Sequence, residues 1–212
     1  DIGRFTSPKQ LQKLAGLEKA LPSALAKRGT ALVLSVVVML AAFVGLGGAK
    51  VRGKYNEARK WYTTGVSADN GYNLSEELTT RANTAANIIT TGTNTLGADH
   101  AEVLAAQDAL TAFQNDLDGL NAGKTRMHAV YEDNTALGAA IDQLYAKLQE
   151  QAADPMKMGA VQGQYGQFNS ANTIIGTLQY NSAVYDYQKE TGGFPASVLG
   201  SIAGIKEVEP FA

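Results

Sequence analysis

The sequence has no cysteine and only two histidines among its 212 residues. The absence of cysteine excludes disulfides, thiolate chemistry, iron–sulfur clusters and cysteine zinc sites. The histidines, His100 and His128, fall in different predicted helices and form no His-Glu-x-x-His pair. The sequence therefore predicts no metal site and no cofactor.

Motifs of catalysis are also missing. No Gly-x-Ser-x-Gly turn occurs, and no glycine-rich phosphate motif follows a strand pattern. Gly159, Gly163 and Gly166 instead fall inside a predicted helix, where their spacing predicts a close approach of another helix. We expect no catalytic residue and predict that the protein is not an enzyme.

Neither sign of charge dominates, because the sequence has 18 basic and 20 acidic residues and a formal net charge of -2. This balance gives no global field for nucleic acid, which we do not expect as a partner. Six basic residues lie before residue 29 and five lie between 50 and 60. Both groups flank one apolar segment and predict contact with anionic membrane lipid.

That segment, residues 29–49, carries no charge. A helix of this length reaches about 30 Å, the thickness of the hydrocarbon core, so the sequence predicts a transmembrane helix. The alternatives are a buried core helix and a cleaved signal peptide, for which the 28 preceding residues are unusually many. The basic flanks do not assign the side of the membrane. Small residues spaced by four, Ala41, Gly45 and Ala49, are candidates for packing between spans in a homo-oligomer.

Residues 1–28 precede the span and predict an amphipathic leader helix. Leucines at helical spacing form an apolar stripe, with lysines mostly off it. Such a helix lies on the bilayer surface or docks against another protein.

Residues 50–192 show apolar positions in alternating steps of three and four, the 3.5-residue repeat of helices packed side by side. Asn73 and Asp99 are the expected N-caps of the first two helices after a linker at 66–71. The seam of the third runs through Met127, Val130, Asn134, Leu137, Ile141, Leu144 and Leu148. A last helix is expected from about Val161 to Glu190.

Short Gly or Pro breaks separate these segments, and no period-two strand pattern occurs. The predicted fold class is all-α: a single transmembrane helix that continues into an antiparallel four-helix bundle with coiled-coil-like seams. Residues 193–212 form an apolar C-terminal tail, too short to cross a bilayer, which is expected to dock on the bundle or lie on the membrane. Asn134 on a seam predicts a register-setting role, with ligand binding as the alternative.

Nine tyrosines are the most distinctive side chains, and several gather in the last predicted helix. Tyrosine buries a large area and keeps a hydrogen-bonding hydroxyl, which suits protein contacts as well as the boundary of a core. The candidate partner contacts are Tyr165, Tyr180, Asn181, Tyr185 and Tyr187.

The last third of the chain carries an ordered set of motifs: Tyr180-Asn181, Val184, Tyr187, Phe194-Pro195 and a hydrophobic tail ending near Phe211. This order resembles the C-terminal signature of LemA family proteins. Tyr55-Asn56 resembles the family's first Tyr-Asn, which also follows a membrane helix. The chain departs from the family in its leader and in lacking the Arg-rich stretch before Asp-Leu-Ile-Pro-Asn-Leu. The resemblance implies a divergent member: a single-pass bacterial membrane protein with an all-α domain and no established catalytic activity.

Together these features predict a membrane-anchored helical interaction or scaffold protein of the bacterial cell envelope. Its expected partners are membrane lipid and other membrane or envelope proteins. The alternatives are a component of a membrane signalling or transport assembly and, ranked last, an accessory hydrolytic factor.

Overall fold

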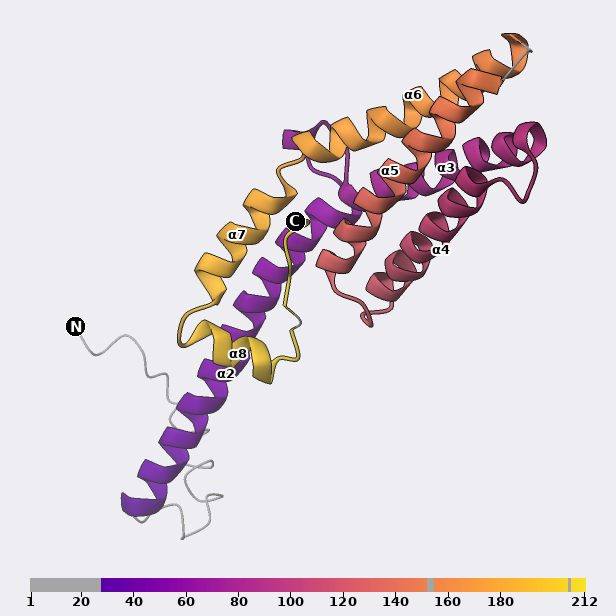
Figure 1. Ribbon diagram of the computed structural model, residues 1–212. Helices are drawn as coiled ribbons and strands as arrows, with labels where there is room; N and C mark the ends of the chain where they lie inside the picture. Colours follow the sequence, from indigo (N-terminus) through magenta and orange to yellow (C-terminus); the bar gives the residue numbers. More distant parts are fainter. Residues whose placement is uncertain (1–27, 152–154, 206) are drawn as a thin grey trace, which may run out of the picture. The chain divides into compact units, whose positions relative to one another are not determined.

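The computed structural model describes residues 28–151, 155–205 and 207–212, and their regular structure is entirely helical (Figure 1). The all-α prediction is confirmed for these residues. The chain divides into two compact units, Asp1–Lys50 and Val51–Ala212. The predicted leader helix at 1–28 lies outside the described residues except for its last position.

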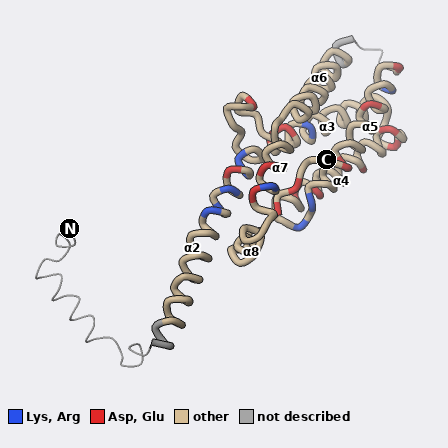
Figure 2. Tube along the Cα trace, turned by 90° about the vertical axis from the view of Figure 1, so that its left-hand side faces the viewer, with Lys and Arg blue, Asp and Glu red and all other residues tan. Residues whose placement is uncertain are grey.

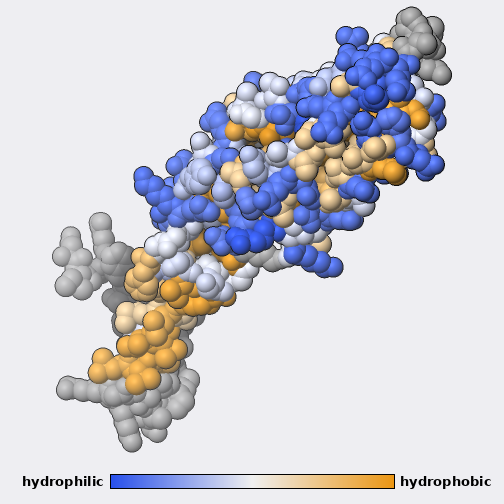
Figure 3. All heavy atoms as spheres, in the orientation of Figure 1, coloured by the Kyte–Doolittle hydropathy of each residue, from blue (hydrophilic) through white to orange (hydrophobic). Residues whose placement is uncertain are grey.

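Helix α2, Arg28–Thr63, contains the apolar segment. Its large apolar side chains are exposed from Leu32 to Leu46, with Leu40 58% exposed (Figure 3). Figure 2 shows that this stretch also lacks charged residues. The helix is therefore long and apolar enough to cross a membrane, a property that a signal sequence near the N-terminus shares.

The small residues of this segment stay candidates for packing between spans. Gly45 is exposed, and a Cβ added there would meet nothing within 4 Å. We expect Gly45→Leu to leave the single chain intact but to weaken self-association, because leucine would keep two helices apart. A two-hybrid assay in membranes measures this, and an unchanged signal would exclude packing through this face.

The second unit holds the remaining elements. They are the 3-10 helix η3 (Ser67–Asp69) and helices α3 (Leu74–Leu96), α4 (Ala101–Asn121), α5 (Met127–Gln151), α6 (Pro155–Thr177), α7 (Tyr180–Thr191) and α8 (Ala196–Ile202). Helix α3 packs against α4, α5 and α6, and α4 packs against α5. Four successive helices thus share one core.

The predicted seams form this core. Every seam position of α5 is buried, and Leu137, Ile141 and Leu144 are fully covered. Val103, Ala106, Leu110, Phe113 and Leu117 play the same part on α4. The burial pattern confirms the predicted 3.5-residue repeat in these helices.

The start of α3 agrees with its sequence signal, and the start of α4 does not. The Asn73 side chain accepts a hydrogen bond from the Glu76 backbone N–H at 2.9 Å, as an N-cap should. The expected cap at Asp99 is wrong, because the N-cap of α4 is His100. The His100 N–H donates to the carbonyl of Gly97 in a turn, which places the helix start one residue later.

The expected single helix to Glu190 is also wrong. The chain breaks after Thr177, and α7 starts at Tyr180. The Asp69 carboxylate accepts the backbone N–H of Gln179 at 3.1 Å, so a contact 110 residues away in sequence satisfies the interrupted backbone.

The predicted close approach at Gly159, Gly163 and Gly166 is not observed, because these glycines are exposed and an added Cβ would meet nothing within 4 Å. The close approach occurs at Gly92 on α3 instead. A Cβ there would lie 2.9 Å from Leu144 Cδ1. The small-residue pattern alone therefore did not locate the tight helix contact.

Within the second unit, α7 runs beside the α2 residues from Val51 onward and in the opposite direction (Figure 1). Lys54 pairs with Glu190 at 3.1 Å. The ring of Tyr62 lies 6.3 Å from that of Tyr180, near the other end of α7. Trp61 and Tyr62 pack against the core.

Candidate functional site

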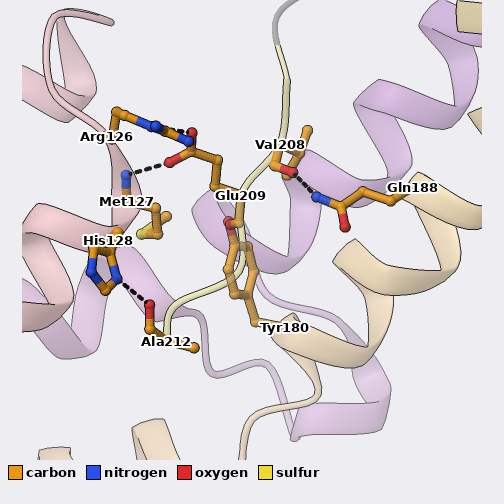
Figure 4. A network of polar contacts seen from close by, with 8 residues as sticks. All are labelled: Arg126, Met127, His128, Tyr180, Gln188, Val208, Glu209 and Ala212. Atoms are coloured by element: carbon orange, nitrogen blue, oxygen red, sulfur yellow. Dashed lines mark hydrogen bonds and ion pairs between the residues drawn. The ribbon is translucent and has the colours of Figure 1, made fainter. Parts of the chain in front are cut away.

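The extended residues 207–212, here called the C-terminal strap, lie between the start of α5 and the side of α7 (Figure 4). The strap has no regular hydrogen-bond ladder of its own, so side chains of the helices satisfy its backbone. Of the two positions expected for the tail, docking on the helical domain is observed for these last residues. The contact is made by Val208 and Phe211, which belong to or pack against the core.

The first part of the apolar tail behaves differently. Phe194 is 86% exposed and Ile202 is 60% exposed, whereas Leu199 is buried. Docking on the core is therefore not observed for Phe194 and Ile202.

Asn181 holds the end of the strap with both atoms of its amide. Its Nδ2 donates to the Phe211 carbonyl at 3.0 Å, and its Oδ1 accepts the Phe211 N–H at 2.7 Å. The Phe211 ring is buried and meets the Tyr131 ring edge-on, with the centroids 5.2 Å apart. The Asn181 side chain thus binds both polar backbone groups of Phe211, whose ring is buried.

Tyr180 and Gln188, also on α7, bind earlier residues of the strap. The Tyr180 hydroxyl donates to the Glu209 carbonyl at 2.8 Å, and Gln188 Nε2 donates to the Val208 carbonyl at 2.9 Å (Figure 4). Together with Asn181, helix α7 therefore supplies donors for the carbonyls of Val208, Glu209 and Phe211.

Glu209 connects the strap to the start of α5. Its carboxylate accepts from Arg126 Nε at 2.7 Å and from the Met127 backbone N–H at 3.0 Å. A carboxylate at this position satisfies a free N–H of the first helical turn and complements the helix dipole. His128, which follows Met127 on α5, places its Nδ1 2.6 Å from the Ala212 backbone oxygen. The strap is thus tied to two helices that are distant in sequence.

We expect Asn181→Ala to lower the free energy of unfolding by about 1–3 kcal/mol, because the backbone N–H and the backbone carbonyl of Phe211 both lose their hydrogen-bond partner. Denaturant melts of residues 51–212 measure the loss. Asn172→Ala is the matched control, since Asn172 is exposed. Equal effects of the two substitutions would show that the amide does not hold the strap.

The Tyr180 hydroxyl gives the strap a dependence on alkaline pH. Burial raises the pKa of Tyr180, and the neighbouring Tyr62 and Glu209 add to the shift. In the unfolded chain tyrosine ionises near pH 10, so above about pH 10 the folded state holds the proton that the unfolded state has lost. The stability from this group is complete below about pH 10 and falls as the pH rises further.

Tyr180→Phe should therefore reduce the steepness of the alkaline loss of stability by up to about 1.4 kcal/mol per pH unit. Denaturant melts at a series of pH values above 9 measure this slope. Identical slopes for the two proteins would contradict the burial of this hydroxyl.

Two cavities flank the strap. One, of about 440 Å³, is lined by Tyr55, Tyr62 and Tyr180 together with Arg126 and strap residues. The other, of about 490 Å³, is lined among others by Arg81, Asn134, Asn181 and Phe211. Both combine aromatic rings with amide or guanidinium donors, which suits binding of polar groups.

Arg81 is a buried cation in the second cavity's wall. It is 2% exposed, its Nε donates to Asn134 Oδ1 at 2.6 Å and its Nη1 donates to the Phe168 carbonyl at 3.1 Å. The guanidinium carbon stands 3.9 Å above the Phe168 ring. Burial lowers the pKa of Arg81 to about 10, partly offset by the charge of Asp142. Arg81 therefore stays charged at neutral pH and orients the Asn134 amide.

The predicted partner contacts do not form one site. Tyr180, Asn181 and Tyr187 share α7, where the first two hold the strap and Tyr187 packs edge-on against Tyr55. Tyr165 lies on α6, where its ring stacks on Tyr145 at 3.8 Å. Tyr185 is 53% exposed. Their contact with another protein stays a prediction.

Sequence reasoning missed Arg81, Gln188 and Glu209. A signal existed for Arg81, which lies three residues after the seam position Leu78 and therefore near the core-facing side of its helix. Gln188 and Glu209 gave no signal, because Gln188 binds an extended segment that has no periodicity and Glu209 belongs to that segment. Across the described ranges no cluster of three His, Asp or Glu side chains suits a metal ion.

Comparisons with known proteins add no relative: no family model, no curated protein and no solved structure matches the chain.

Proposed function

We propose that the chain is a membrane-anchored helical scaffold of the bacterial cell envelope, a divergent relative of LemA family proteins. In this proposal residues 29–49 cross the membrane once. Helices α3–α6 form an antiparallel four-helix bundle, and the domain contacts other membrane or envelope proteins through the exposed side of α7. Catalysis has no part in it.

The observation that carries the proposal is the strap and its partners. Among the residues on which the resemblance rests, Asn181 binds the Phe211 backbone through its amide and Tyr180 donates to the Glu209 carbonyl, so these three residues lie in one network. A motif whose members are spaced 30 residues apart in sequence thus acts as one physical unit. Its role is to close the helical domain rather than to transform a substrate.

The antiparallel arrangement is supported by connection lengths. Helix α3 ends at Leu96 and α4 starts at Ala101, while α4 ends at Asn121 and α5 starts at Met127. Connections this short join antiparallel neighbours. The shared core of these helices fits the same arrangement.

Because Tyr180 and Asn181 are occupied by the strap, Tyr185 is the predicted contact left open to a partner on α7. A photo-reactive benzoylphenylalanine at this position tests the proposal in membranes of the bacterium that makes the protein. We expect a cross-linked envelope protein from position 185. Leu104 on α4, 46% exposed, is the matched control position. Cross-linking at 185 no stronger than at 104 would contradict an interaction surface on α7.

A further inference from the structure

Helix α8 presents large apolar side chains that the described residues of the second unit leave largely exposed. Val198 is 48% exposed and Ile202 is 60% exposed, and they lie one turn apart on one face of the helix. Phe194, just before the helix, is 86% exposed. The opposite face is buried through Leu199 and Gly200. The helix is therefore fixed on one side and apolar on its free side.

The fixed side of α8 lies against the α2 residues that directly follow the apolar segment. A Cβ added to Gly200 would lie 3.6 Å from Val51 Cγ1, and Arg52 Nη2 donates to the Ala203 carbonyl at 2.9 Å. Val51 and Arg52 follow the last residue of the predicted span by two and three positions. At 1.5 Å per residue this is about 3–5 Å along the helix axis.

From this placement we propose that α8 is a second membrane contact, in which Phe194, Val198 and Ile202 insert into the interfacial layer of the lipid bilayer. The inference rests on the proposal that residues 29–49 cross the membrane. If they do, Arg52 stands at the headgroups, and its hydrogen bond to Ala203 holds the end of α8 at the same depth. The aromatic ring and the two aliphatic side chains leave water there.

The composition of residues 193–205 favours binding to a lipid surface whatever the charge of its headgroups. Residues 193–205 include no charged residue. Insertion of this segment therefore depends on buried apolar area and is insensitive to salt, unlike the attraction of a basic cluster to anionic lipid.

The absence of native cysteine allows a direct test with the full chain in phosphatidylcholine nanodiscs. Single cysteines introduced as Val198→Cys, Leu40→Cys and Leu104→Cys each carry the environment-sensitive fluorophore NBD. Lipids with a nitroxide quencher at a shallow or a deep position report contact with the bilayer. Leu40 lies in the predicted span, and Leu104 is an exposed apolar control on α4.

We expect blue-shifted emission at position 198 with loss of fluorescence to the shallow quencher, unchanged by added salt. Position 40 should lose fluorescence to the deep quencher, and position 104 should show water-like emission without quenching. Quenching at 40 without quenching at 198 would overturn the α8 inference alone, and blue-shifted but unquenched emission at 198 would assign its face to a protein partner instead. No quenching at 40 would overturn the membrane span itself.

Discussion

Ile141→Ala should lower the free energy of unfolding of the helical domain by about 2–5 kcal/mol, through lost transfer energy and the cavity left behind. Ile141 is fully buried in the middle of the α5 seam, between the equally buried Leu137 and Leu144. Neighbouring helices on two sides limit how far the site can collapse. The measurement is a denaturant melt of residues 51–212 followed by circular dichroism.

The control lies on the same helix. Lys147 is partly exposed and pairs with Glu150 at 2.8 Å, a surface contact that contributes little. Lys147→Ala should change the free energy of unfolding by less than about 0.5 kcal/mol. A one-residue slip turns the buried face of a helix by about 100°, so the contrast also tests the register. A loss at Lys147 as large as that at Ile141 would contradict the seam and the architecture built on it.

The second large effect is expected at Arg81. Arg81→Ala should cost about 3–5 kcal/mol, because it empties the space over the Phe168 ring and leaves the Asn134 amide and the Phe168 carbonyl without their donor. Within the described part of the chain Arg81 makes no salt bridge. Its contribution to stability therefore comes from these hydrogen bonds and from its contact with the Phe168 ring.

A double substitution separates the two contributions. Arg81→Met keeps much of the side-chain volume, and Asn134→Leu removes the amide that the guanidinium orients. If the hydrogen bond couples the two residues, the combined loss is smaller than the sum of the single losses. Arg59→Met on an exposed position is the control for charge removal. Additive losses, or an Arg81 effect no larger than that of Arg59, would contradict the buried hydrogen-bonded role.

The seams were predictable from sequence because burial in packed helices recurs every three to four residues, and leucine, isoleucine and phenylalanine mark those positions directly. Asn134 was visible for the same reason, as the polar member of an apolar repeat. Its partner Arg81 was missed although it lies near the core-facing side of its helix, because a charged side chain normally marks a solvent-exposed face. The Phe168 ring and the Asn134 amide also lie on helices far from Arg81 in sequence, so no local pattern pairs them with it.

The break between α6 and α7 shows a second limit. No glycine or proline stands at Leu178 or Gln179, so local propensity continues the helix. At the break the Asp69 carboxylate accepts the Gln179 N–H, a contact that forms only in the folded chain. The strap follows the same rule: its conformation is set by Asn181, Tyr180 and the start of α5, and an extended segment leaves no pattern of its own.

We expect residues 29–49 to remain in the mature protein as a membrane anchor for the helical domain. Mass spectrometry of the protein retained in carbonate-washed membranes tests this expectation, with residues 51–212 expressed alone for comparison. The retained protein should contain residues 29–49, and residues 51–212 alone should stay soluble and strongly helical. Release of the full chain by the wash, or a mature protein that starts after residue 49, would contradict it.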